Sequence, residues 1–145
     1  MNQNNLDFQS TFLKNTPSSP IIQEYIGKHE SFKLYSSEIE IENNKISLDV
    51  LIKNEVAYIT FSSYDEFNQP DFTTLLGFEK PIKAFNTIVD SLIMMVGNIK
   101  ESDIYYSIEI NDKKRLNLYT RTLKRYGLKL VKNAEEKNNY YIENL

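Results

Sequence analysis

The chain has 145 residues, of which 41% are hydrophobic and 26% charged, and its formal net charge is −3. This length and composition are typical of one globular domain, and the slightly acidic charge gives no general attraction to nucleic acid or anionic membranes. The absence of cysteine excludes a disulfide framework, a cysteine nucleophile and a thiolate metal site.

The N-terminal segment, residues 1–27, is polar and is interrupted by Pro17 and Pro20. It shows no sustained hydrophobic period, so we expect irregular structure, with short helices over 7–14 and 20–26. It also lacks the apolar segment of a signal peptide, and no stretch of the chain is long and apolar enough to cross a membrane. A cytoplasmic location is therefore expected.

Alternating apolar and polar residues predict antiparallel strands in the next part of the chain. Short turns that contain asparagine, at Asn43-Asn44 and at 53–55, separate the first three strands. A looser segment precedes the fourth. The expected strands span residues 32–42, 46–52, 56–61 and 72–77.

The period becomes helical after Glu79. A helix is predicted from Lys80 to Ile99, with Pro81 in its first turn, where proline is favoured. Its apolar residues lie nearly all round the helix, which indicates that the helix is buried between a sheet and other elements.

The elements after this helix complete the fold class. They are expected over residues 104–110 (strand), 112–126 (helix), 128–131 and 140–143 (strands). Asp112 can cap the second helix and Gly127 can end it. A strand-helix-strand unit requires a right-handed crossover and a parallel pair. We therefore predict a single α/β domain over 1–145, an α+β mixed sheet with antiparallel N-terminal strands, a central helix and a β-α-β-β C-terminal half.

Three segments of the C-terminal half resemble a known family. They are Lys83–Asp90, Asp103–Glu109 and Arg115–Gly127, within a region that spans Leu75 to Val131. Together they resemble the GNAT N-acetyltransferases, and most of all a divergent group of small GNAT-like proteins that is common in bacteriophage genomes. The resemblance implies a GNAT-like fold and a phage-encoded protein, located in the host cytoplasm or in the virion.

The resemblance also implies a site for acetyl-coenzyme A. In the family the coenzyme lies in a splay between two parallel strands, and a loop with glycines and the following helix start bind its pyrophosphate. The loop corresponds to Thr74–Pro81, and a tyrosine on the last helix commonly protonates the leaving thiolate. The residues so implied are Leu76, Gly77, Phe78, Lys80 and Arg115 for cofactor binding and Tyr119 for catalysis.

Three residues depart from the family pattern. Glu79 stands where a second glycine is expected; its carboxylate would repel a pyrophosphate, although an acid suits a plain helix start. Pro81 removes one N–H donor. Leu123 occupies the position, one turn before the final glycine, where the tyrosine is common. Tyr119 is therefore read in two ways, as a general acid or as a core residue in a stripe with Leu116.

Two smaller groups carry weaker signals. His29 is the only histidine and is predicted to be a surface residue, and no metal site is expected because no plausible ligand set exists. Glu38, Glu40 and Glu42 are spaced to share one strand face, which is either a solvated face or an acidic site for an amine acceptor.

A basic cluster without acidic residues extends from Lys113 to Lys129. On the predicted helix the outward residues are Lys114, Arg121, Lys124 and Arg125. They form either a solvated face or a contact for a polyanion, which would be the phosphates of coenzyme A, nucleic acid or an acidic protein surface. No known nucleic-acid motif is present, so sequence-specific nucleic-acid binding is not expected.

Two functions of different classes follow. The first is a non-catalytic interaction or structural protein on a GNAT-like scaffold with a degenerate acyl-coenzyme A site, carried in a larger assembly such as a phage particle. The departures from the family pattern favour it. The second is an active N-acyltransferase that uses acetyl-coenzyme A, favoured by the retained Gly77, Arg115 and Tyr119.

Overall fold

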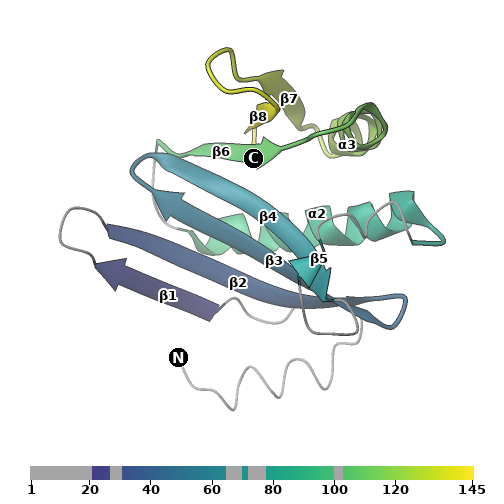
Figure 1. The fold of residues 1–145 in the computed structure, drawn as a ribbon, viewed down its shortest axis with the longest axis horizontal. Coiled ribbons are helices and arrows are strands. Elements are labelled where there is room, and N and C mark those ends of the chain that lie inside the picture. Colours follow the sequence, from purple (N-terminus) through teal and green to yellow (C-terminus); the bar gives the residue numbers. More distant parts are fainter. Residues whose placement is uncertain (1–20, 27–30, 65–69, 72–77, 100–102) are drawn as a thin grey trace.

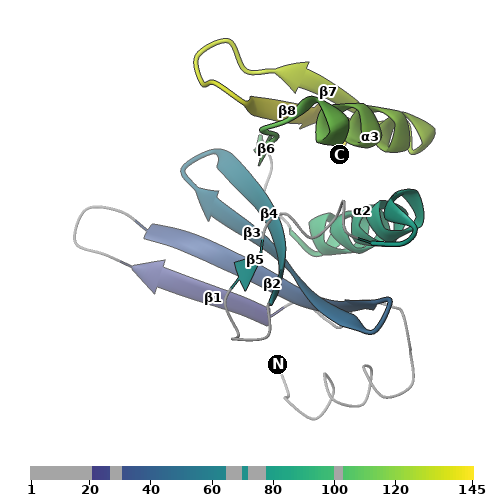
Figure 2. The same ribbon diagram turned by 45° about the vertical axis from the view of Figure 1, so that its right-hand side comes forward.

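The computed structural model describes residues 21–26, 31–64, 70–71, 78–99 and 103–145. They form an α+β fold, in which one mixed and mostly antiparallel sheet carries two helices (Figure 1 and Figure 2). The elements are β1 (Ile21–Ile26), β2 (Ser31–Ile41), β3 (Asn44–Lys53), β4 (Val56–Tyr64), β5 (Pro70–Asp71), α2 (Pro81–Asn98), β6 (Tyr105–Glu109), α3 (Lys113–Arg125), β7 (Lys129–Lys132) and β8 (Asn139–Glu143). The predicted mixed sheet and its β-α-β-β C-terminal half are confirmed.

The sheet has the strand order β1-β2-β3-β4-β6-β8-β7, and β5 pairs with β4. Strands β1 to β4 form an antiparallel meander, whereas β4 and β6 are parallel. Strand β8 lies between β6 and β7 and is antiparallel to both. The parallel pair requires a crossover, which α2 supplies, and α3 then makes a second crossover from β6 to β7.

The turn between β2 and β3 differs from the expected one. Ile41 pairs with Asn44, so the two turn residues are Glu42 and Asn43, not Asn43 and Asn44. Both have positive φ, 49° and 65°, as a type I′ turn requires, since its twist matches that of the strands. Asparagine adopts this conformation readily, but glutamate does so at a cost. The backbone at Glu42 is therefore held by its surroundings.

The predicted helix over 20–26 is wrong, because Ile21–Ile26 is strand β1. Its pairing with β2 runs from Ile21 opposite Ser36 to Ile26 opposite Ser31. Pairing with the edge of β2, together with the strand preference of isoleucine and tyrosine, outweighs the weak helical preference of this segment. The predicted helix over 7–14 and most of the irregular N-terminal segment lie outside the described residues, as does the predicted strand over 72–77.

The core lies between the sheet and the two helices. Phe61 of β4 contacts both Phe85 of α2 and Tyr119 of α3, with ring centroids 6.0 and 5.9 Å apart, so both helices cover the same sheet face. In Figure 2 the two helices lie side by side along this face. The largest fully buried side chains are Ile39, Ile46, Leu48, Met95, Leu123, Val50 and Val89.

Helix α2 is less buried than its composition predicted. One side packs on the sheet, but Ile82, Ile93 and Met94 are 47%, 40% and 57% exposed. The expectation of burial all round is therefore wrong, because no described element covers this side of the helix. Neither α2 nor α3 combines the length and the apolar character that a membrane crossing needs.

Helix α3 is capped at both ends as predicted. The Asp112 carboxylate accepts a hydrogen bond of 2.8 Å from the N–H of Arg115. At the other end Gly127 has φ 75°, its N–H donates to Lys124 O, and the N–H of Leu128 donates to Leu123 O. These two bonds define a Schellman motif, which needs a residue with positive φ at this position.

The cap predicts how acid affects stability. The backbone hydrogen bond from Arg115 holds the pKa of the Asp112 carboxyl below its usual value. A lowered pKa stabilises the fold above the unfolded-state pKa, and this stabilisation is lost as the pH falls through the folded-state pKa. Asp112→Asn keeps a cap acceptor but no charge, so it should cost up to about 1 kcal/mol at neutral pH and progressively less in acid.

Urea unfolding of both proteins, in steps from about pH 7 to about pH 3, measures this difference. Asp112→Ala is the control, because it removes the acceptor as well as the charge; it should cost more than Asp112→Asn at every pH, by up to about 1 kcal/mol, and its cost should fall in acid by the same amount, since neither variant has the titrating group. A constant difference between the wild type and Asp112→Asn would contradict the assignment.

Candidate functional site

A cleft of about 530 Å³ lies where the parallel strands β4 and β6 separate. Their pairing ends with Ile59 opposite Ile108, and β6 continues only to Glu109 whereas β4 runs on to Tyr64 (Figure 1). Helix α3 closes one side of the cleft. The lining residues are Ile59, Thr60, Phe61, Ile108, Glu109, Asn111, Arg115 and Tyr119.

Tyr119 lies at the inner wall of this cleft. It is 3% exposed, and its ring stacks on Phe85 at a centroid distance of 4.2 Å with 12° between the planes. Burial raises the pKa of its hydroxyl, and the positive charge of Arg115 opposes that rise only in part. A phenol with a raised pKa gives up its proton less readily. The predicted core position is confirmed, and the catalytic role stays a prediction.

Arg115 reaches the same cleft from the first turn of α3. Its guanidinium forms an ion pair with Asp112, and its side chain is 18% exposed. The pair therefore holds the cation beside the Tyr119 ring, where it could meet an anionic group in the cleft. Leu123, one turn further along the helix, is 1% exposed and contributes only to the core.

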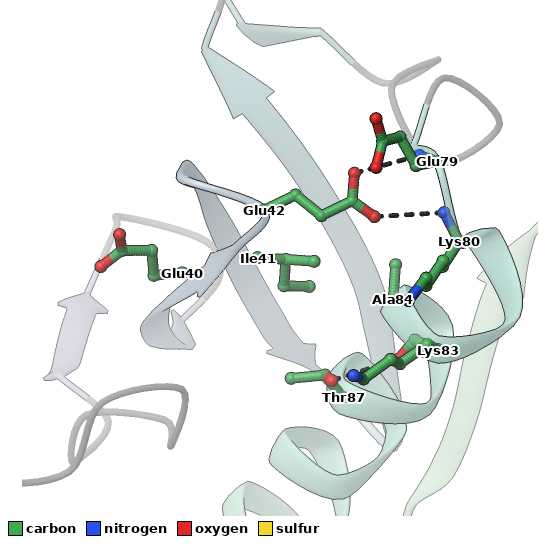
Figure 3. Close-up of a pocket in the computed structure, with 8 residues that line it drawn as sticks. All are labelled: Glu40, Ile41, Glu42, Glu79, Lys80, Lys83, Ala84 and Thr87. Carbon is green, nitrogen blue, oxygen red and sulfur yellow. Dashed lines mark hydrogen bonds between the residues drawn. The ribbon is translucent and has the colours of Figure 1, made fainter.

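The start of α2 is occupied by a carboxylate from elsewhere in the chain. The two carboxylate oxygens of Glu42 accept hydrogen bonds from the backbone N–H groups of Glu79 and Lys80, at 3.0 and 3.2 Å. Figure 3 shows the Glu42 side chain reaching from the β2–β3 turn to this backbone. The N-cap residue Lys80 makes no side-chain cap, so Glu42 supplies the negative charge that a helix start favours.

The position of Glu42 corrects the prediction that three glutamates share one strand face. Glu38 and Glu40 lie on β2 and are exposed, but the strand ends at Ile41. Glu42 follows in the turn with positive φ, which directs its side chain toward α2 (Figure 3). A shallow cavity of about 300 Å³ beside this contact is lined by Glu40, Ile41, Glu42, Glu79, Lys80, Lys83, Ala84 and Thr87.

The residues of the predicted pyrophosphate loop differ in their burial and in whether the structure describes them. Phe78 is 6% exposed and its side chain belongs to the hydrophobic core, so only its backbone could meet a ligand. Lys80 is exposed, and its N–H is one of the two that donate to Glu42. Leu76 and Gly77 lie outside the described residues. In the described part of the loop, the N–H groups of Glu79 and Lys80 therefore already have an acceptor.

The basic face of α3 points outward, as predicted. Lys114, Arg121, Lys124 and Arg125 are all exposed, whereas Tyr119 and Leu123 on the opposite side are buried. Tyr126 fixes the orientation of the helix, because its hydroxyl donates to Asp90 Oδ1 of α2 at 2.9 Å. Burial, and then this hydrogen bond, raise the pKa of Tyr126 to about 12.

Sequence patterns did not identify several residues of the two sites. Thr60, Glu109 and Asn111 line the cleft only because the strands separate beside them. Glu42 meets α2 through a turn conformation that neither spacing nor charge reveals. The positive φ of a glutamate could not be read from the sequence, in which the pair Asn43-Asn44 was the sign of the turn.

Comparison of the chain with protein-family models, curated proteins and solved structures finds no match. Among the residues that the structure describes, no group of three or more histidine, aspartate and glutamate side chains could hold a metal ion. The features of the molecule that bear on function are the geometry of the cleft, the Glu42 contact and the basic face.

The Glu42 contact predicts a stability difference between two neighbouring glutamates. Glu42→Gln removes the charge at the start of α2 and should lower the free energy of unfolding by about 0.3–1 kcal/mol at low salt. Glu40→Gln is the matched control, because Glu40 lines the same cavity while Glu42 is the one bonded to the helix N–H groups. Urea unfolding of the three proteins tests this; equal values for the two variants would show that Glu42 does not cap the helix.

Proposed function

We propose that the protein is a GNAT-like scaffold with a degenerate acyl-coenzyme A site, and that it acts as a non-catalytic interaction protein in a larger assembly. The observation that carries this proposal is the carboxylate of Glu42 on the N–H groups of Glu79 and Lys80. In the family that the sequence resembles, such donors at a helix start bind the coenzyme's pyrophosphate. In this protein the carboxylate of Glu42 accepts their hydrogen bonds instead.

The scaffold part of the proposal draws support from topology. A parallel pair, β4 and β6, is connected by α2, and a cleft lies where the two strands separate. Helix α3 brings Arg115 and Tyr119 to that cleft. This is the arrangement that the resemblance to GNAT proteins implied, although sheet order alone does not determine function.

Electrostatics argues against a functional pyrophosphate site. A diphosphate at the start of α2 would have to displace the Glu42 carboxylate and would then lie near two negative charges, those of Glu42 and Glu79. Lys80 and Lys83 offset these charges only partly, because both are exposed and screened by solvent. The Glu42 carboxylate already lies at the positive end of the helix, so a phosphate there would meet a negative charge and two N–H groups that already have an acceptor.

The residues at the positions expected for catalysis are equally unsuited to it. Tyr119 is stacked in the core, its pKa is raised, and Leu123 replaces the tyrosine that the family pattern places one turn further on. The surface offers a better candidate for function, because the basic face of α3 stands outward on a chain whose remaining residues are strongly acidic. Such a face attracts and orients an acidic partner surface.

An active acetyl-coenzyme A-dependent N-acyltransferase is the second candidate. One observation favours it: the cleft between β4 and β6 has a volume within the usual range for small-molecule sites and contains both a tyrosine and an arginine. Tyr119 would then donate the proton to the leaving thiolate, and Arg115 would meet an anionic part of the substrate.

Calorimetric titration of the purified protein with acetyl-coenzyme A separates the two candidates. We expect weak or undetectable binding by the wild type and measurably tighter binding by the double variant Glu42→Gln, Glu79→Gly, which removes both charges and leaves one neutral acceptor in place of the carboxylate on the two N–H groups. Glu40→Gln is the control and should behave as the wild type. Micromolar or tighter binding by the wild type would overturn the non-catalytic proposal, and no gain in the double variant would show that α2 does not begin at a former phosphate site.

A turnover assay with acetyl-coenzyme A tests the second candidate directly. If the protein is an enzyme, Tyr119→Phe should lower kcat by about 10²-fold, the lower end for the loss of a general acid, because only the hydroxyl is removed. The melting temperature reports on the fold and should hardly change, since the phenylalanine ring keeps the stack on Phe85. Unchanged turnover would remove Tyr119 from the mechanism.

A further inference from the structure

A groove of about 300 Å³ lies between the start of α2 and the exposed side of α3. It shares no lining residue with the cleft between β4 and β6. Ile82 of α2 and Leu118 of α3 form its apolar part. Its remaining lining residues are Lys114, Asn117, Arg121, Thr122 and Arg125.

The apolar part of the groove is accessible. Ile82 is 47% exposed and lies in the first turn of α2, while Leu118 beside it is half-buried. A single exposed isoleucine is ordinary on a protein surface. Two neighbouring apolar side chains in a concave site, with arginines around them, have instead the composition of the centre of a protein interface.

The charged part of the groove has one sign. Three of its lining residues are cations, and none is an acid. Within the described residues, neither Lys114, Arg121 nor Arg125 has an ion-pair partner at salt-bridge distance. A ligand that brings carboxylates to this rim would gain hydrogen-bonded ion pairs without breaking existing ones.

We propose that this groove binds an acidic protein segment that presents one apolar side chain. The apolar side chain packs on Ile82 and Leu118, and flanking carboxylates pair with Lys114, Arg121 and Arg125. The inference rests on the proposed function as an interaction protein and defines the chemistry of its partner.

Other polyanions fit the groove less well. Its volume is at the lower limit of small-molecule sites, which suits one side chain better than a nucleotide. No aromatic residue lines it, so it offers no stacking platform for nucleic-acid bases. The backbone N–H groups of Glu79 and Lys80, which would favour a phosphate near the start of α2, are held by Glu42.

Fluorescence anisotropy of the full chain with two labelled synthetic peptides tests the proposal. The first has the sequence Asp-Glu-Asp-Leu-Glu-Asp-Glu, and the second carries serine in place of leucine. The leucine peptide should bind about tenfold more tightly, and raising the salt from about 0.05 M to about 0.3 M should weaken the binding of both.

Substitutions inside the groove, compared with control substitutions outside it, show whether the peptide binds in the groove. Ile82→Ser should remove the preference for leucine, whereas Ile93→Ser, an exposed isoleucine further along the same helix, should retain it. Arg121→Glu with Arg125→Glu should weaken both peptides by tenfold or more, and Lys137→Glu, in the exposed turn before β8, should have little effect. Circular dichroism melts confirm that each variant is folded.

The outcomes separate this inference from the proposed function. Three results would overturn the proposal that the groove binds an acidic segment. They are equal binding of the two peptides, no binding of either, and displacement of the labelled leucine peptide by polyuridylate at a lower concentration than the unlabelled leucine peptide requires. Displacement by acetyl-coenzyme A would overturn both proposals, because the groove would then belong to a coenzyme site. Leucine-selective binding together with turnover of acetyl-coenzyme A would overturn the non-catalytic function and leave the groove in place.

Discussion

The parallel pairing of β4 with β6 is the constraint on which the rest of the fold depends. Four residue pairs join them, from Val56 opposite Tyr105 to Ile59 opposite Ile108. Parallel neighbours cannot be connected by a tight turn, so the chain must cross over one face of the sheet, and such crossovers are right-handed in nearly all proteins. That handedness puts α2, and then α3, on the same face, where Phe61, Phe85 and Tyr119 meet. The cleft forms because the pairing stops before β4 does.

Local sequence signals predicted those parts of the fold that neighbouring residues determine. Asp112 and Gly127 define α3 because capping and positive φ are properties of a few adjacent residues. The phase of α3 was also predictable, since burying unpaired lysine or arginine is costly. The state of Ile21–Ile26 was not, because pairing with the edge of β2 decides it. The exposed side of α2 could not be predicted either, since periodicity does not say how many neighbours a helix has.

The residues of the candidate site also divide into those that the sequence identified and those that it did not. The resemblance to GNAT proteins implied Tyr119 and Arg115, and the two side chains line one cleft because they lie four residues apart on one helix. Glu42 was grouped with Glu38 and Glu40 by strand spacing, and a two-residue turn separates it from them. Its partner residue Glu79 is far away along the chain, so only the three-dimensional arrangement joins them. A carboxylate at a helix start stabilises the fold and occupies backbone donors that would otherwise attract an anion.

The position of β8 has a consequence for how the protein is made. Strands β6 and β7 are synthesised before β8, yet β8 lies between them and pairs with both. Until Asn139–Glu143 leaves the ribosome, the edge of β6 that faces away from β4 has no partner, and β7 has none either. Unpaired strand edges are templates for aggregation. The nascent chain is thus exposed to misassociation until β8 pairs with both β6 and β7. Chaperone binding during synthesis would protect it at this stage.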